Sequence, residues 1–512
     1  MMPTYTSSNK RIAKNTLLLY ARMLFNMAIA LYTSRIVLEA LGVDDYGIYN
    51  VVGGIVSMMS FLNTAMTSAS QRFISYEQGT NNLDKQKKVY SASVRTQILL
   101  VIIVVVICES IGLWFLNAKM NIDPYRMVAA NIVYQCALIT FSFAILMVPF
   151  TASIIAHEKM GVYAVVTVMD GIIKLIIAYL LLIFNGDKLI LYSALLTTIA
   201  ILNWLVYYLF CRKIFPECRF VKECDTTLFK KMFSFAGWSF IGNFGFAAKD
   251  YGVNIVLNLF FGTAVNAARG VALQVSNALM GVVSNFQLAM NPQITKCYAT
   301  GDVEPMKSLI RRGSRFSFYL ISLVAIPLLL RTEYLLGLWL VDVPKYTSEF
   351  LKLSLVMGVV NSMFGPMVTG MQATGNIKVF QIVIAAIMLC DLPLAYLLLN
   401  LGLEPYIVVY VAIGTAFVGL VARLFLLDKE IRIGFSNFFI HIICKNILLF
   451  VAMILPLFML NKIFNETFIS LIIITLISAL WIALIVFVLG LEKGEKLMVI
   501  SKIKHYVKHG KR

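Results

Sequence analysis

The stretch ISLIIITLISALWIALIVFVLGL, residues 469–491, carries no charged side chain. A helix rises about 1.5 Å per residue, so a helix of this length crosses a hydrocarbon core about 30 Å thick. Residues 98–116, ILLVIIVVVICESIGLWFL, form a second such run with a single glutamate. Both runs are continuous and do not alternate apolar with polar residues, which excludes the strand pattern of a membrane β-barrel. They predict membrane-spanning helices.

The composition extends this prediction to the whole chain. Of the 512 residues, 60% are hydrophobic and 14% are charged, and the mean hydropathy is +0.83. A soluble protein carries about 25% charged residues. We predict an all-α polytopic membrane protein with about fourteen transmembrane helices. The predicted spans are 14–39, 46–67, 92–116, 126–155, 162–185, 188–211, 229–260, 264–290, 309–330, 347–373, 377–400, 404–427, 437–460 and 467–490.

The basic residues predict how the spans are oriented. Most of the 44 Lys and Arg residues fall in alternate loops, and loops rich in Lys and Arg stay in the cytoplasm. This places both termini in the cytoplasm, in agreement with an even number of spans. It also explains the net charge of +18 without nucleic-acid binding, which would need a soluble basic face. We expect no cleavable signal sequence, because residues 1–14 are polar and the apolar run after them is too long.

The sequence has no signature of catalysis or of metal binding. It contains no GxxxxGK[ST], HExxH or GxSxG motif. The eight cysteines and four histidines do not follow a zinc-binding spacing. We therefore expect a secondary transporter or an uncoupled flippase with no cofactor, and not an enzyme.

Two parts of the chain resemble each other at an offset near 220 residues. LGVDDYG (41–47) corresponds to FGTAVNA (261–267), and AYLLL occurs at 178–182 and again at 395–399. Copies of six spans each have the same orientation and are related by an axis along the membrane normal. The predicted organisation is an N-terminal lobe (1–211), a cytoplasmic linker (212–228), a C-terminal lobe (229–430), two additional helices (431–490) and a basic tail (491–512) expected on the anionic inner leaflet.

Two stretches resemble a known family. NPQITKCYATGD (291–302) resembles the Pro…Tyr/Gly-Asp pattern that ends the eighth helix in the multidrug/oligosaccharidyl-lipid/polysaccharide exporter superfamily. ARGVALQVSNALMGVVSNF (268–286) is similar to its glycine- and serine-rich eighth helix. Six plus six plus two spans is the layout of its polysaccharide flippases, whereas its drug exporters usually have twelve. In the flippases, basic residues of the first and eighth helices line a cationic cavity; the resemblance implies this role for Arg22 and Arg269.

The first predicted span contains two arginines with different predicted roles. Arg22, Asn26 and Thr33 fall within about 40° of one another on a helix, so they form one polar stripe that we interpret as lining the cavity. The alternative for Arg22 is a side chain that reaches back to the inner interface. Arg35 lies about 140° away and precedes Glu39 by four residues, which predicts a structural ion pair.

The seventh span has a polar face that includes Asn243 and Asp250. We predict that Asn243, Lys249 and Arg269 contribute to substrate binding, and that Asp250 couples transport to H⁺ or Na⁺. The alternative for Asp250 is a structural pair with Lys249, Arg269 or Arg22, because ionisable groups inside the membrane mark either pathways or pairs.

Two further charged positions lie in predicted spans. Asp170 and Lys174 are four residues apart and are expected to form a structural pair. In the repeat alignment, Asp391 occupies the position of Lys174, so these opposite charges could meet across the lobes.

The resemblance implies a flippase that moves polyprenyl-diphosphate-linked oligosaccharide units of O-antigen, capsule or exopolysaccharide from the inner to the outer leaflet by alternating access. It implies the bacterial inner membrane, with membrane lipids, a polysaccharide polymerase and glycosyltransferases as partners. Internal arginines agree, because guanidinium groups bind phosphate oxygens bidentately and stay charged. The alternatives are a cation-coupled multidrug exporter or a peptidoglycan-precursor lipid flippase of the same superfamily, and a non-transporting scaffold.

Overall fold

The computed structural model describes residues 5–57, 60–80, 82–119, 122–221, 225–261, 263–340 and 343–497. Across these ranges the chain is helical and forms no strand. The first part of the chain contains α1 (Tyr5–Ser57), α2 (Ser60–Thr80), α3 (Leu83–Ile107), η1 (Cys108–Gly112), α4 (Leu113–Lys119), η2 (Pro124–Arg126), α5 (Met127–Leu146), α6 (Val148–Ala156), α7 (Met160–Ile183) and α8 (Lys188–Ile214).

The remaining elements follow in the same manner. They are α9 (Thr226–Phe261), α10 (Thr263–Ala299), α11 (Val303–Leu330), α12 (Thr332–Trp339), α13 (Thr347–Ser362), α14 (Phe364–Thr374), α15 (Lys378–Leu389), α16 (Asp391–Asn400), α17 (Ile407–Ile431), α18 (Phe435–Phe438), η3 (Phe439–Cys444), α19 (Lys445–Asn461), α20 (Phe468–Ile485) and η4 (Val486–Gly490).

The predicted fold class is confirmed: the protein is an all-α polytopic membrane protein. Among the described residues, ten helical segments are long and apolar enough to cross a membrane. The other four predicted spans lie on α1, α2, α9 and α10, which are helical but more polar. α1 covers the first predicted span and the beginning of the second, which ends within α2. α1 is interrupted at Gly42, whose φ of 76° and ψ of 173° are accessible chiefly to glycine. The break falls in the turn predicted between the two spans.

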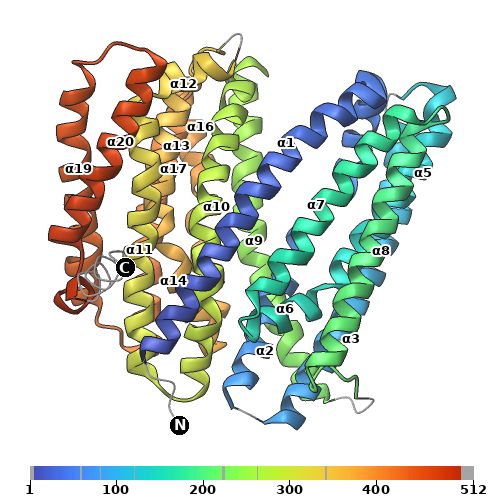
Figure 1. The fold of residues 1–512 in the computed structure, drawn as a ribbon, viewed down its shortest axis with the longest axis horizontal. Helices are drawn as coiled ribbons and strands as arrows, with labels where there is room; N and C mark the ends of the chain where they lie inside the picture. The colour runs from blue at the N-terminus through green and yellow to red at the C-terminus, as the bar shows by residue number, and fades with distance from the viewer. Residues whose placement is uncertain are drawn as a thin grey trace, which may run out of the picture. The chain divides into compact units, whose positions relative to one another are not determined.

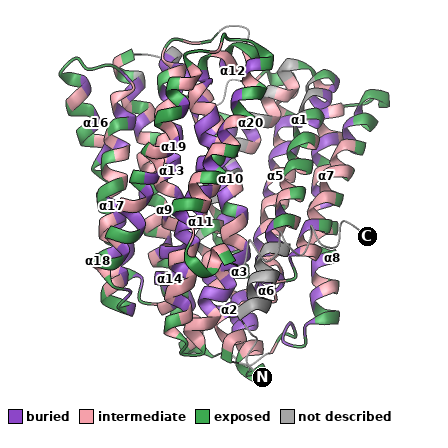
Figure 2. Ribbon diagram, turned by 60° about the vertical axis from the view of Figure 1, so that its left-hand side comes forward, coloured by how far each residue is buried: buried purple, intermediate pink, exposed green. Residues whose placement is uncertain are grey.

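The surface of the spanning helices is apolar. On α7 the exposed side chains recur every three to four residues, as Val165, Met169, Ile173 and Ile176. Figure 2 shows exposed residues along the length of α7 and α17. Such a continuous apolar face is costly in water and suits a lipid environment.

The described chain divides into two compact units. The first unit contains 1–247, 285–306 and 369–386, and the second contains 248–284, 307–368 and 387–512. The lobes predicted from the repeat follow chain order and stay a prediction. The two compact units interleave along the chain. The reason is that the long helices α9 and α10 each contribute one part to each unit.

The first unit is built around α1 and α7, which lie side by side (Figure 1). A buried cluster joins the end of α1 to α3 and α5 through Val52, Val104 and Tyr134. The Tyr134 hydroxyl donates to the carbonyl of Cys108 at 2.7 Å, where α3 passes into the π-helical turn η1. In the second unit, Phe318 and Phe350 are fully buried.

Candidate functional site

Arg22 lies on α1 and contacts two other helices of the first unit. Its Nη2 donates to the side-chain oxygen of Asn285 on α10 at 2.9 Å. Its guanidinium carbon lies 4.8 Å from the centre of the Tyr163 ring on α7. Both partners are uncharged. Among the described residues, no carboxylate lies within ion-pair distance of Arg22.

Arg22 retains hydrogen-bonding capacity that the described residues do not use. Its Nε is buried and has no hydrogen-bond partner there, and the same holds for the side-chain oxygen of Asn26 one turn later. A buried donor or acceptor without a partner costs about 1–3 kcal/mol. Asn26 also sits beside Gly171 of α7, where a Cβ would come within 3.4 Å of its side-chain oxygen. Arg22 and Asn26, in the predicted polar stripe of α1, therefore border α7 and α10.

A second polar cluster holds the ends of these helices together. Glu158, in the turn between α6 and α7, accepts hydrogen bonds from Gln293 at 2.9 Å and from Lys296 at 3.2 Å, both on α10. Its carbonyl accepts from the Asn15 side chain at 3.1 Å. Glu158 adopts a left-handed φ of 58°, which is uncommon for a residue other than glycine. The sequence does not predict this cluster, because neither the turn conformation nor the distant α10 partners are visible in a local pattern.

In the second unit, Arg269 is neutralised by Asp250. Arg269 Nη2 donates to the Asp250 carboxylate at 2.5 Å, and Nη1 donates to the Asn254 side chain at 2.5 Å. Arg269 is buried, whereas 42% of the Asp250 side chain is exposed. This geometry matches the structural alternative for Asp250, and the coupling role remains a prediction. Arg269 thus differs from Arg22, which has uncharged partners.

Lys249 forms an ion pair with Asp391 of α16 at 2.5 Å, and Asp391 is only 1% exposed. The expected meeting of Asp391 with Lys174 stays a prediction. Lys174 pairs with Asp170 one helical turn away on α7, at 2.7 Å. Asp170 also accepts a hydrogen bond from Asn203 on α8 at 2.7 Å. These pairs satisfy the charges locally within each unit.

Three other predicted positions add less to the site. Asn243 lies on α9 and is partly buried. Glu39 is exposed on α1. The side chain of Arg35 lies outside the described residues, so its pairing with Glu39 stays a prediction.

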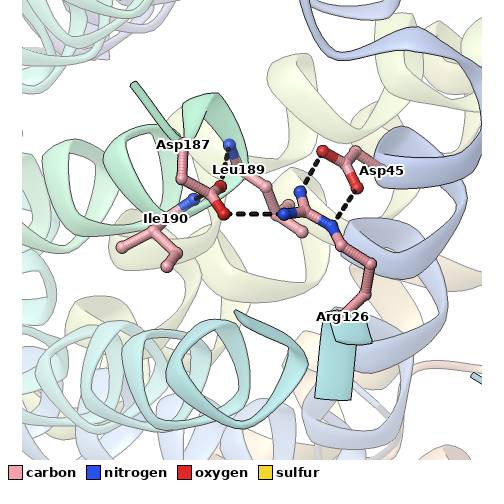
Figure 3. Close-up of polar contacts among 5 residues, drawn as sticks. All are labelled: Asp45, Arg126, Asp187, Leu189 and Ile190. Carbon is pink, nitrogen blue, oxygen red and sulfur yellow. Dashed lines mark hydrogen bonds and ion pairs between the residues drawn. The ribbon is translucent and has the colours of Figure 1, made fainter. Parts of the chain in front are cut away.

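A further charge network, missed from the sequence, joins α1, η2 and the N-cap of α8. Figure 3 shows the Arg126 guanidinium between the carboxylates of Asp45 and Asp187. The second oxygen of Asp187 accepts from the backbone amides of Leu189 and Ile190, both at 3.1 Å, and so caps α8. Burial opposes ionisation of Asp187, but the Ile190 amide and the Arg126 guanidinium outweigh it and lower its pKa.

The described residues contain no group of His, Cys, Asp and Glu arranged to hold a metal ion. The fold brings Arg22, Asn26, Asn285 and Tyr163 together in the first unit. In the second unit it brings together Arg269, Asp250 and Asn254. Asn285 follows Gly281 by four residues and so lies on the same face of the helix, and that spacing was a signal that could have identified it.

The chain resembles solved transporter structures in fold. A MATE transporter in complex with MaL6 superimposes with a TM-score of 0.69 at 12% identity, covering 82% of this chain and 97% of that chain. An outward-facing multidrug resistance MATE family transporter of the MOP superfamily gives 0.68 at 13%, covering 82% and 96%. A MOP superfamily transporter from Pyrococcus furiosus gives 0.66 at 12%, also covering 82% and 96%.

Sequence comparison adds no closer assignment. No family model matches the chain, and no curated protein matches it. At 12–13% identity, the structural likeness shows a shared fold. The chain is a multi-pass helical membrane protein with the fold of the MATE transporters.

Proposed function

We propose that this protein is a membrane transporter of the MOP superfamily that flips a lipid-linked oligosaccharide carrying a diphosphate. One observation carries the choice of substrate. Arg22 is a cation in a predicted span, and its partners among the described residues are an amide and an aromatic ring. Its Nε has no hydrogen-bond partner among these residues. A permanent charge at this depth is costly, so it favours an anionic ligand as the missing partner.

The chemistry of guanidinium supports phosphate as that ligand. The planar fork binds two phosphate oxygens at once, and the group stays charged at any physiological pH. Asn285 and Tyr163 hold the Arg22 guanidinium from two other helices. A diphosphate could then complete the hydrogen bonding that these residues leave open. The sugars would occupy the polar stripe of α1 while the polyprenyl tail stays in lipid.

The membrane potential supports the direction of transport. Moving two negative charges out of a negative interior releases about 4.6 kcal/mol per 100 mV. Coupling to H⁺ or Na⁺ at Asp250 is a further hypothesis. Arg269 lies 2.5 Å from that carboxylate, so protonation or ion binding would have to compete with an existing pair.

The second candidate is a multidrug exporter. It is favoured by the fold, because one similar structure is a multidrug resistance transporter. Fold alone does not decide the substrate; for the MOP superfamily transporter from Pyrococcus furiosus, the reverse polarity of the binding pocket suggests a different function. A flippase for a peptidoglycan precursor would use the same phosphate chemistry, and neighbouring glycosyltransferase genes would favour the oligosaccharide substrate over it.

Transport in reconstituted vesicles tests the proposal. The substrate is a polyprenyl-diphosphate oligosaccharide with a fluorescent label on its sugar, and a membrane-impermeant quencher reports its leaflet. The wild-type protein should expose inner-leaflet label, Arg22→Ala should lose most of this activity, and Arg219→Ala, at an exposed arginine, should keep it. Equal activity of Arg22→Ala and wild type would refute the role of Arg22. Export of ethidium without flipping of the lipid would favour the drug exporter.

A further inference from the structure

A cavity of about 850 Å³ opens in the first unit, away from the residues of the Arg22 site. Its walls come from α2, from the first turns of α9 and from the turn that leads into α15. These segments are widely separated in sequence but belong to one compact unit. They lie at ends of helices that the charge pattern predicts to face the cytoplasm. We call this space the basic cavity.

The charge of the basic cavity is strongly positive. Four cations line it, namely Arg72, Lys230, Lys231 and Lys378, against a single carboxylate, Glu77. The N-terminus of α15 also borders it, and unpaired amide groups at a helix N-terminus favour anions. The N-terminus of α9 is capped by Asp225, which accepts from the Leu228 amide at 3.0 Å. Cations that converge on one concave space select negative charge there.

Arg72 is held in place by its surroundings. Its Nε donates to the carbonyl of Gln372 and its Nη2 to that of Ala373, both at 3.1 Å. The Phe235 ring lies 5.7 Å from its guanidinium carbon. Gly375 has a φ of 81°, and a Cβ there would lie 2.6 Å from Arg72 Nη2. The backbone bonds use Nε and Nη2, so Nη1 remains for a ligand in the part of the chain that the structure describes.

The volume of the basic cavity indicates the size of its ligand. A volume of this order suits a molecule of drug size, for which pockets of about 300–1,000 Å³ are usual. Inorganic phosphate alone would leave most of it empty. The indole of Trp238 forms part of the wall, with Lys378 Nζ lying 5.0 Å from its centre. An aromatic surface beside a cation suits a ring that carries phosphate.

We propose that the basic cavity binds a phosphate-bearing ligand with an attached ring, such as a sugar or nucleoside diphosphate or an anionic lipid headgroup. The site is separate from the proposed contact of Arg22 with substrate, and it does not depend on which molecule is transported. The lysines would supply charge, Arg72 a fixed donor, and Trp238 the surface for the ring.

The experiment uses the full-length protein and its own fluorescence. Trp238 reports on the cavity, and the spectrum of Trp238→Phe identifies its share of the signal. Inorganic pyrophosphate and a uridine diphosphate sugar are titrated against protein in phosphatidylcholine nanodiscs. A second arm compares these nanodiscs with nanodiscs of equimolar phosphatidylcholine and phosphatidylinositol. The test variant is Lys230→Gln/Lys231→Gln/Lys378→Gln.

A matched variant, Lys159→Gln/Lys213→Gln/Lys429→Gln, removes the same charge at exposed lysines elsewhere. If the ligand is soluble, both phosphate probes should give a saturable change in Trp238 fluorescence, weakened at least about tenfold in the test variant. If it is a lipid, the change should appear with phosphatidylinositol and vanish in the test variant. Either result supports the site. The proposal is overturned if no probe or lipid changes the Trp238 fluorescence. It is also overturned if both lysine variants weaken that change equally.

Discussion

Arg22 Nη2 donates to the side-chain oxygen of Asn285 at 2.9 Å and thereby joins α1 to α10. The pair differs from the other intramembrane contacts of the predicted site, because Asn285 brings no charge to neutralise the arginine. Lys249 and Arg269 each meet a carboxylate. Arg22 therefore has no counter-charge among the described residues, and Asn285 sets the direction in which its guanidinium points.

This pair predicts a coupling between the two side chains. Asn285→Ala should reduce flipping about tenfold, because Arg22 loses its fixed orientation. In an Arg22→Ala background the same change should have almost no further effect, which corresponds to a coupling of about 0.5–3 kcal/mol. Asn131→Ala, which breaks the contact with Asn117, serves as the control and should leave flipping unchanged. Additive losses in the double variant would show that the two residues act separately.

The Lys249–Asp391 pair predicts that removing one partner destabilises the protein more than removing both. Lys249→Met should lower the free energy of unfolding by about 3–5 kcal/mol, because it leaves the carboxylate of Asp391, only 1% exposed, without a partner. Lys249→Met/Asp391→Leu should recover most of that loss. Thermal unfolding in detergent measures both. Lys352→Met, which breaks an exposed pair with Glu333, should cost less than about 1 kcal/mol. A double variant no more stable than Lys249→Met would contradict this account.

The network in Figure 3 predicts a dependence on pH. Asp187→Ala removes the cap of α8 and should cost about 1 kcal/mol at pH 7. The folded-state pKa of Asp187 is lowered. Its stabilisation is therefore present above the unfolded pKa of about 3.9 and is lost as the pH falls through the folded value. Melting temperatures of wild type and variant should differ at pH 7 and converge at acidic pH. Asp84→Ala, at an exposed aspartate, should show no such convergence.

Two glycines of α9 predict opposite responses to the same substitution. A Cβ at Gly245 would lie 2.9 Å from the Cβ and 3.0 Å from the Cα of Ala385 on α15, and backbone has little room to move. Gly245→Ala should therefore destabilise the protein by about 1–3 kcal/mol. A Cβ at Gly237 would meet no atom within 4 Å, so Gly237→Ala should be neutral or slightly stabilising. Melting temperatures of the two variants compare them directly, and equal effects would argue against close packing of α9 on α15.

The sequence alone determined that this is a polytopic helical membrane protein, where its helices lie, and that Asp170 and Lys174 lie within reach of each other. Each of these follows from local spacing: an apolar run long enough to cross the bilayer must form its hydrogen bonds within itself, and residues four apart share a helix face.

Only the tertiary structure decided which distant side chains meet. Lys249 with Asp391, Arg269 with Asp250, and Arg22 with Asn285 join different helices, and the helical period says nothing about partners on another helix. A charge inside the membrane must find a counter-charge or a polar contact wherever packing supplies one. The packing of helices therefore separated Arg22, which has uncharged partners, from the charges that are already paired.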